Sequence, residues 1–348
     1  MRDNNELRTR IPFGAFSIRE AKYSAALILC ILAAGMAWPQ GKKPVEQPQD
    51  PAGFKIGVEV NMVTVPITLR RPEGGFIKGL PKSVFHIYEN GVEQEITFFA
   101  QEGLPTHIAL VLDTSGSVRS EWGTIKFSTK KFIENLKPDD QFAIITFSSD
   151  VRLRMDWGRN RDRLDAVLSS IYCKDNTKLW DAIYVASNDV LKAIREKKAM
   201  IIMSDGLDNE SLITYEEALE TVVRSEAAVY VVSKTQAVRQ MMMSEMTQQR
   251  IYENLPDNIF AQADQVLRKL AYETGGRVLY PNNFGQLDDI YAQVNDELRN
   301  QYTAGYISSN SVKDGSYRNI EVRVEEPNAI ISARPGYYAP NEIRGRAE

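Results

Sequence analysis

Cysteine and histidine are scarce in this 348-residue chain, which has two of each. Zinc sites draw on these residue types in spacings such as C-x-x-C and H-E-x-x-H, and neither motif is present. A zinc site is therefore not expected. Cys30 falls in a segment that we expect to be removed, which leaves Cys173 without an intramolecular disulfide partner. We expect Cys173 to be a partly buried, small apolar side chain.

Sequence motifs of several enzyme classes are also absent. The chain has no G-x-S-x-G nucleophile motif, and no motif links either histidine to a serine, which argues against a serine hydrolase. Phosphate-binding loops of the Walker or dinucleotide type are missing too, so nothing in the sequence points to a nucleotide.

The N-terminal apolar run is too short to be a typical membrane span. It extends from Ala25 to Ala37, about 13 residues, whereas a helix needs roughly 20 to cross a bilayer. Basic residues precede it, and Gly35-Met36-Ala37 places small residues at its end. We predict a secretory signal peptide at 1–37, with an uncleaved N-terminal anchor as the alternative. The protein is then expected to be secreted or periplasmic and associated with the cell envelope.

An excess of positive charge is missing as well. The formal net charge is −4, and residues 1–37 hold five basic and three acidic side chains, so their removal changes it to −6. Nucleic acids reward dense patches of Lys and Arg, and a mildly acidic chain does not supply them. We therefore predict no nucleic-acid partner, and contact with a membrane only through an uncleaved anchor.

Two regions of β-type pattern flank the centre of the chain. Residues 38–53 are rich in proline and are predicted to be a linker, and 54–104 follow with strictly alternating apolar residues whose phase slips at Met62-Val63. Asn90-Gly91 lies between the expected strands 84–89 and 92–99 and suits a type I′ hairpin turn. The pattern returns in 301–340, before a tail at 341–348. Because two or three strands need a surface to pack on, we expect the two β segments to form one small β-sandwich.

Between the flanks, residues 105–300 alternate apolar strands with amphipathic helices. Strands that are apolar throughout predict a mainly parallel sheet covered by helices on both faces, so the fold class is a doubly wound α/β domain inserted in the sandwich. The expected strands are 108–112, 142–147, 199–203, 229–232 and 277–280, and the expected helices include 161–171, 179–194, 215–225, 258–274 and 287–300.

Oxygen-bearing side chains lie at the ends of two expected strands and at the start of one expected helix. Asp113-Thr114-Ser115-Gly116-Ser117 comes directly after the strand 108–112, Thr177 opens a helix, and Asp205 follows the strand 199–203. Ligands of such folds bind beyond the carboxyl ends of the strands, where these residues would converge. A hard cation such as Mg²⁺ takes oxygen ligands of this kind. D-x-S-x-S alone is a weak signal, because Asp and Ser are common in turns.

With Thr177 and Asp205 included, the chain resembles the von Willebrand factor A family over roughly residues 106–300. The metal-ion-dependent adhesion site of that Rossmann-like fold is built from D-x-S-x-S, a Thr on a later loop and an Asp after the fourth strand. The resemblance implies that Ser115, Ser117 and Thr177 touch Mg²⁺, or Mn²⁺ or Ca²⁺, while Asp113 and Asp205 hold the ion mainly through water. One departure is Asp175-Asn176, where many relatives have two glycines, which predicts a stiffer loop or an extra oxygen ligand.

The flanks resemble the von Willebrand factor A-related proteins of Acidobacteria, an exported subfamily of largely undefined function. The residues that carry this resemblance are 85–92, 317–322 and 334–338. It supports the architecture more than a biological role.

The sequence predicts an exported, non-catalytic, adhesion-type binding protein. Its partner would be a protein that presents an acidic residue to the metal. A structural envelope scaffold with a non-essential metal is one alternative. A Mg²⁺-dependent phosphohydrolase is another, although an aspartate nucleophile usually has a second Asp two residues on, and that position is Ser115 here.

Three further features of the sequence each allow two interpretations. The insertion 234–255 carries four methionines, which either form an adaptable binding surface or pack on their own domain. Trp122 either edges a ligand surface or is half-buried. Asp181 either orients a metal ligand or serves as a surface or capping carboxylate.

Overall fold

The computed structural model describes residues 62–101, 104–237 and 257–341. The expected signal peptide, the linker, the first residues of the N-terminal β segment and the four methionines of the insertion lie outside these ranges. Among the described residues, no helix is long and apolar enough to cross a membrane.

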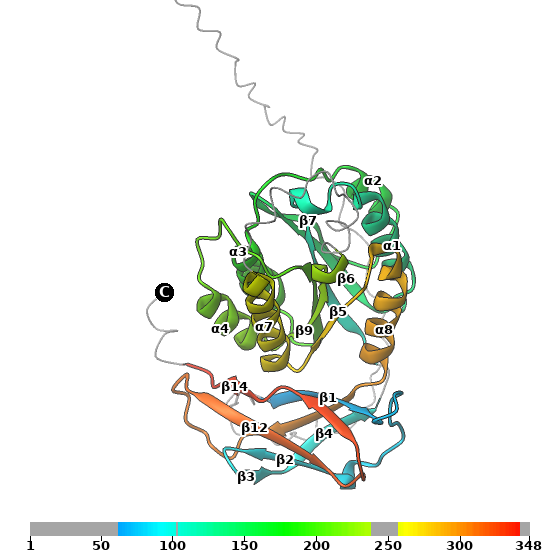
Figure 1. The fold of residues 1–348 in the computed structure, drawn as a ribbon. Coiled ribbons are helices and arrows are strands. Elements are labelled where there is room, and N and C mark those ends of the chain that lie inside the picture. The colour runs from blue at the N-terminus through cyan, green and yellow to red at the C-terminus, as the bar shows by residue number, and fades with distance from the viewer. Residues whose placement is uncertain (1–61, 102–103, 238–256, 342–348) are drawn as a thin grey trace, which may run out of the picture. The chain divides into compact units, whose positions relative to one another are not determined.

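The central domain is built on a six-stranded sheet (Figure 1). Its order is β10-β9-β8-β5-β6-β7, and every neighbouring pair is parallel except β6 and β7. The prediction of a mainly parallel sheet is therefore confirmed, and the antiparallel edge strand β7 is an addition to it. The strands are β5 (Thr106–Asp113), β6 (Gln141–Phe147), β7 (Val151–Gly158), β8 (Lys197–Ser204), β9 (Ala228–Ser233) and β10 (Arg277–Leu279).

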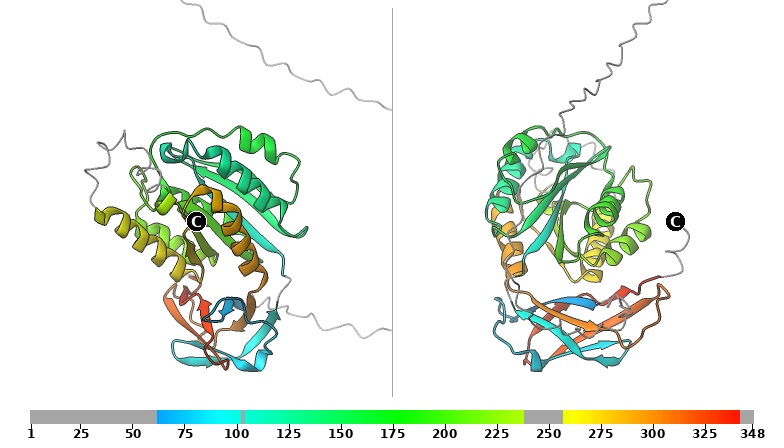
Figure 2. Two further views of the ribbon diagram at one scale, coloured as in Figure 1. Left: turned by 45° about the vertical axis from the view of Figure 1, so that its right-hand side comes forward. Right: turned by 180° about the vertical axis from the view of Figure 1, so that it is seen from behind.

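Helices cover both faces of this sheet because each central strand is apolar on both sides. Along β5, Ile108, Leu110 and Leu112 face the core under α1, α2 and α8, whereas Ala109 and Val111 face the core under α3, α4 and α7. Figure 2 shows the two helical layers from other sides. The helices are α1 (Trp122–Glu134), α2 (Leu164–Ser169), α3 (Leu179–Val185), α4 (Tyr215–Ser225), α7 (Asp257–Glu273) and α8 (Leu287–Arg299).

Two expected helices differ in extent from the prediction. The helix expected over 161–171 is only α2, and the one expected over 179–194 is α3 followed by a π-helical stretch, Ala186–Leu191. The predicted start of α4 is confirmed in detail, because Thr214 and Glu217 form a reciprocal capping box there.

The flanking segments form two four-stranded sheets that share one apolar core. Their orders are β13-β1-β11-β4 and β14-β12-β2-β3, so each sheet mixes strands from both ends of the chain, as expected of a sandwich with an inserted domain. Short 3₁₀ turns are found at Lys82–Val84, Gly116–Val118 and Phe284–Gln286. The strands are β1 (Met62–Arg70), β2 (Phe85–Glu89), β3 (Val92–Gln94), β4 (Ile96–Gln101), β11 (Tyr302–Ile307), β12 (Tyr317–Val324), β13 (Ile330–Ala333) and β14 (Gly336–Tyr338).

The hairpin at Asn90-Gly91 is confirmed, since both residues have positive φ, 48° and 81°, as a type I′ turn requires. The single strand expected over 92–99 was wrong. It breaks at Glu95 into β3 and β4, which belong to different sheets. The chain therefore crosses from one sheet to the other at this residue.

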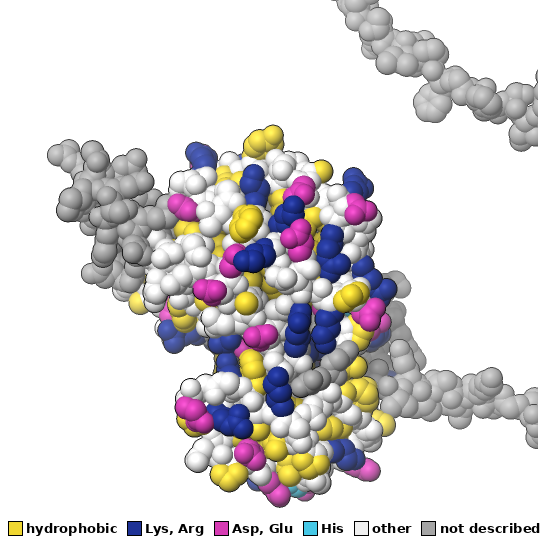
Figure 3. All heavy atoms as spheres, turned by 90° about the vertical axis from the view of Figure 1, so that its right-hand side faces the viewer, with side chains coloured by type: hydrophobic (Ala, Val, Ile, Leu, Met, Phe, Trp, Pro, Cys, Tyr) yellow, Lys and Arg dark blue, Asp and Glu magenta, His cyan; other side chains and the backbone are white. Residues whose placement is uncertain are grey.

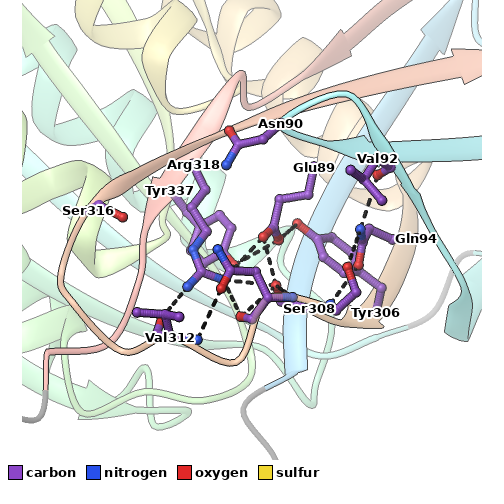
Figure 4. Close-up of polar contacts among 12 residues, drawn as sticks. Glu89, Asn90, Val92, Gln94, Tyr306, Ser308, Val312, Ser316, Arg318 and Tyr337 are labelled. Carbon is purple, nitrogen blue, oxygen red and sulfur yellow. Dashed lines mark hydrogen bonds and ion pairs between the residues drawn. The ribbon is translucent and has the colours of Figure 1, made fainter.

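A buried ion pair organises one end of the sandwich (Figure 4). Arg318 on β12 and Glu89 on β2 are each 3% exposed and lie 3.1 Å apart. The hydroxyls of Tyr306 and Tyr337 both donate to Glu89 Oε2 at 2.9 Å. Arg318 also donates to the carbonyls of Asn310 and Val312, so it fastens the loop before β12 to the core.

A second buried carboxylate joins the sandwich to the central domain. Glu297 on α8 is fully buried and pairs with Arg70 on β1, at 3.4 Å, and with Arg277 on β10, at 2.5 Å. The Tyr230 hydroxyl on β9 lies 3.5 Å from its other oxygen. Glu297 is therefore held by strands of both parts of the molecule.

Candidate metal centre

The loop after β5 is folded around the carboxylate of Asp113. Asp113 is completely buried, and its Oδ1 accepts a hydrogen bond of 2.7 Å from the backbone N–H of Ser115. The Ser115 and Ser117 hydroxyls lie 3.0 Å apart, Ser115 buried and Ser117 exposed. This Asx-type turn places one carboxylate and two hydroxyls at the carboxyl end of the strand.

Asp205 reaches the same edge from the neighbouring strand β8. It is almost fully buried, and its Oδ1 accepts a hydrogen bond of 3.2 Å from Leu207 N–H. Gly206 follows it with φ of +80°, and a Cβ there would come within 2.7 Å of the Ala263 carbonyl oxygen on α7. A glycine is needed at this position for the loop to turn beneath α7.

The structure places a lysine at the centre of these oxygens. Lys234 directly follows β9, the strand beside β8, and its side chain is 1% exposed. Its Nζ lies 2.7 Å from Asp113 Oδ2, 3.3 Å from Asp205 Oδ2, 2.7 Å from Ser117 Oγ and 3.3 Å from Ser115 Oγ. Four of the five predicted site residues thus meet around one positive charge.

Sequence reasoning missed Lys234. It was grouped with the insertion that begins there, although a lysine directly after a buried parallel strand is a signal for this edge of the sheet.

The two carboxylates keep this lysine charged. Burial lowers the pKa of Lys234, but the negative charges of Asp113 and Asp205 outweigh that effect and leave the pKa above its usual value. Burial raises the pKa of Asp205, and Lys234 opposes that rise.

Thr177, the fifth predicted site residue, lies on the loop before α3. Hydrogen bonds between its backbone and Asn209 hold it there. Its backbone N–H donates to Asn209 Oδ1 at 2.8 Å, and its carbonyl accepts from Asn209 N–H at 3.1 Å. In the described part of the chain, no hydrogen bond joins its side chain to Asp113, Ser115, Ser117 or Asp205. The loops that carry Thr177 and Asp205 are thus tied together through Asn209, which sequence reasoning also missed.

Asp208 completes this connection, and its loss has a measurable consequence. Its Oδ1 accepts hydrogen bonds from Leu179 N–H at 2.7 Å and from the Ser211 hydroxyl at 2.6 Å, which satisfies the first turn of α3. We expect Asp208→Ala to lower the free energy of unfolding by about 1 kcal/mol, as for the loss of a helix cap. Urea denaturation measures this loss in the free energy of unfolding. Glu210→Ala, in the same loop but exposed, is the control, and an equal loss in both variants would contradict the capping role.

Other side chains near the site take ordinary structural positions. Asp175 is exposed and pairs with Arg119 at 3.1 Å, and its Oδ1 lies beside Gly116 of the metal-site loop. Asn176 donates to Glu210 Oε1 at 2.9 Å. Trp122 is buried and donates to the Ile171 carbonyl. Asp181 accepts from Leu212 and Ile213 N–H, so it is a capping carboxylate.

Cys173 is partly buried against the core, as expected, and burial raises the pKa of its thiol.

The residues around Lys234 fit a hard divalent cation. Two carboxylates and two hydroxyls surround one point, which is the oxygen donor set that Mg²⁺, Mn²⁺ or Ca²⁺ prefers. Asp113 Oδ2 is buried, and the contact of 2.7 Å that it makes is with the Lys234 ammonium. Lys234 therefore supplies a positive charge at this position from within the chain.

Comparison with known proteins identifies the central domain. The model of the von Willebrand factor type A domain matches residues 107–293. No curated protein matches this chain.

Several solved structures are similar to it. One is a mussel byssus protein, proximal thread matrix protein 1, with its MIDAS motif occupied by zinc, at 16% identity, 60% coverage of this chain, 49% of that chain and a TM-score of 0.43. A mutant of the PilB minor pilin from Streptococcus sanguinis has 10% identity, coverages of 58% and 63%, and a TM-score of 0.42. A von Willebrand factor type A protein from Catenulispora acidiphila has 11% identity, coverages of 75% and 74%, and a TM-score of 0.42. The chain spans about half the length of the mussel protein.

Proposed function

The chain belongs to the von Willebrand factor type A domain family, and from this premise we propose that it is an exported, non-catalytic binding protein. It engages a protein partner through a divalent cation held at the carboxyl edge of the central sheet. The resemblance of its flanks to the Acidobacteria-type related proteins supports this proposal, and the segment 1–37 is the proposed export signal. Mg²⁺ is the proposed ion, with Mn²⁺ or Ca²⁺ as substitutes.

One observation carries this proposal: oxygens from two neighbouring strand ends converge on a single cation position. Ser115, Ser117, Asp113 and Asp205 would hold the ion, with Thr177 joining from the adjacent loop. A divalent ion bound there supplies positive charge that an acidic side chain of a partner can approach. Ser117 is the exposed member of the set, so the partner would approach on its side.

The surrounding loops offer surface for a protein. Lys174 N–H donates to the Thr114 carbonyl at 2.9 Å, which packs the loop 172–175 directly against the metal-site loop. In that loop Tyr172 is 76% exposed, and Leu212, in the loop after Asp205, is 86% exposed. Tyrosine is enriched at protein–protein interfaces, which supports a protein contact beside the metal-site loop. On the face in Figure 3, positive and negative side chains are intermixed, which does not favour nucleic acid.

The geometry also supports a non-catalytic role. A phosphohydrolase needs a carboxylate that can attack, whereas Asp113 is fully buried and both of its oxygens face Ser115 N–H and Lys234. A Ser–Lys pair needs a neutral amine to take the serine proton, and the raised pKa of Lys234 keeps the ammonium beside Ser117 charged.

A second candidate function, a binding scaffold that needs no metal, is favoured by Lys234 itself. The ammonium already joins both strand ends, so the loops are held in place without an ion.

Partner capture separates the two functions. We expect immobilised protein to retain exported proteins in the presence of Mg²⁺ and to release them when a chelator is added. Asp113→Asn should capture none of them, whereas Asp189→Asn, an exposed aspartate away from the site, should behave as the wild type. A partner set that ignores the chelator would instead support the scaffold. Phosphatase activity lost in Asp113→Ala but kept in Thr177→Ala would support an enzyme.

A further inference from the structure

The position of Lys234 is fixed by the sheet. Its backbone N–H donates to the Ser204 carbonyl at 3.1 Å, which continues the pairing of β9 with β8 by one residue. The next residue, Thr235, donates its hydroxyl to the Asp205 carbonyl at 3.4 Å. These two hydrogen bonds fix the backbone of Lys234 beside Asp205. From this position the Lys234 side chain reaches Asp113 and the two serines.

The ammonium group satisfies the cluster as a cation would. It has three protons and four oxygens within 3.3 Å, two of them carboxylate oxygens. Without it, two buried carboxylates would lie close together with no counter-charge, which is strongly unfavourable. The same oxygens are the proposed ligands of the divalent ion. Lys234 and the ion therefore compete for one position.

We propose that Lys234 is a built-in competitor of the metal, which fills the adhesion site in the metal-free protein and must leave before a divalent ion can bind. This inference rests on the proposed ligand set. It adds the requirement that the Lys234 side chain moves out of the site before the ion binds. The exposed side of the cluster is at Ser117, so the ammonium leaves in that direction by rotation of its flexible four-carbon stem. The ion therefore gains the two carboxylates only when it displaces the ammonium that pairs with both of them.

Mn²⁺ binding to purified protein tests this without any partner. Removing the competitor in Lys234→Met should tighten Mn²⁺ binding at least about tenfold relative to the wild type, measured by calorimetry. The unfolding temperature of Lys234→Met should rise more steeply with Mn²⁺ than that of the wild type.

The matched control is the double variant Lys234→Met with Asp113→Asn. It carries the same net charge at the site as the wild type, so it should fold without metal. Because it lacks one proposed carboxylate ligand, it should bind Mn²⁺ more weakly than Lys234→Met.

The outcomes separate the competition by Lys234 from the metal-dependent function. Equal, tight binding by the wild type and Lys234→Met would overturn the competition and leave the metal-dependent function intact. No binding by either folded protein would remove the metal site and the competition together. If Lys234→Met folds only when Mn²⁺ is present, the competition is supported. If it fails to fold at any Mn²⁺ concentration while the double variant folds, the ion cannot replace the lysine and the inference is wrong.

Discussion

Replacing Arg318 by methionine will lower the free energy of unfolding by about 3–5 kcal/mol, as breaking a buried ion pair does. The substitution leaves the Glu89 carboxylate in the sandwich core without its counter-charge. It also removes the hydrogen bonds that hold the carbonyls of Asn310 and Val312. Tyr306 and Tyr337 still donate to Glu89, but two hydroxyls do not replace a guanidinium charge. Urea or thermal denaturation of the purified variant gives the value.

The same strand provides the control. Arg323 also lies on β12, pairs with Glu321 at 2.7 Å and has a side chain that is 60% exposed. Arg323→Met should therefore cost no more than about 1 kcal/mol, as expected of a surface ion pair. Similar losses in the two variants would show that burial of the pair is not what makes it important. A second variant with both Glu89→Gln and Arg318→Met should recover part of the lost stability, because no buried charge is left unpaired.

Much of the central fold could be predicted because burial on both faces leaves a direct mark on the sequence. The runs 108–112 and 229–232 are apolar throughout, a pattern that is typical of a parallel strand covered on both faces. β7 lacks this mark. It lies at the sheet edge and none of its residues is buried, so its sequence is mixed, as in Arg152-Leu153-Arg154, and it was missed.

Most of the oxygen-bearing residues of the site could be predicted from the sequence, whereas Lys234 could not. Asp113, Ser115 and Ser117 share one loop, so their proximity follows from the chain itself. Lys234 meets them only because β9 lies beside β8 and β8 beside β5, a strand order that no short stretch of sequence contains. The partners of Glu89 and Glu297 were unpredictable for the same reason, since each pairs with an arginine far away in the chain.

Glu297→Gln should weaken the connection between the sandwich and the central domain, with a loss of about 2–4 kcal/mol. Glutamine keeps the shape of the side chain but not its charge, so Arg70 and Arg277 lose their shared counter-ion. We place the loss below that of Arg318→Met because both arginines are partly exposed and water can solvate them. Since Glu297 is the carboxylate that strands of both parts hold, the two parts should unfold less cooperatively in the variant.

The measurement compares a probe of the central domain with a probe of the whole molecule. Tryptophan fluorescence reports mainly on the central domain, which contains Trp122, Trp157 and Trp180 of the four tryptophans, and backbone circular dichroism reports on both parts together. In the wild type the two urea transitions should coincide, and in Glu297→Gln they should separate. Asp296→Asn removes the neighbouring, exposed charge on the same helix and should leave the transitions coincident. If Asp296→Asn has the same effect, general charge on α8, and not the buried contact of Glu297, joins the two parts.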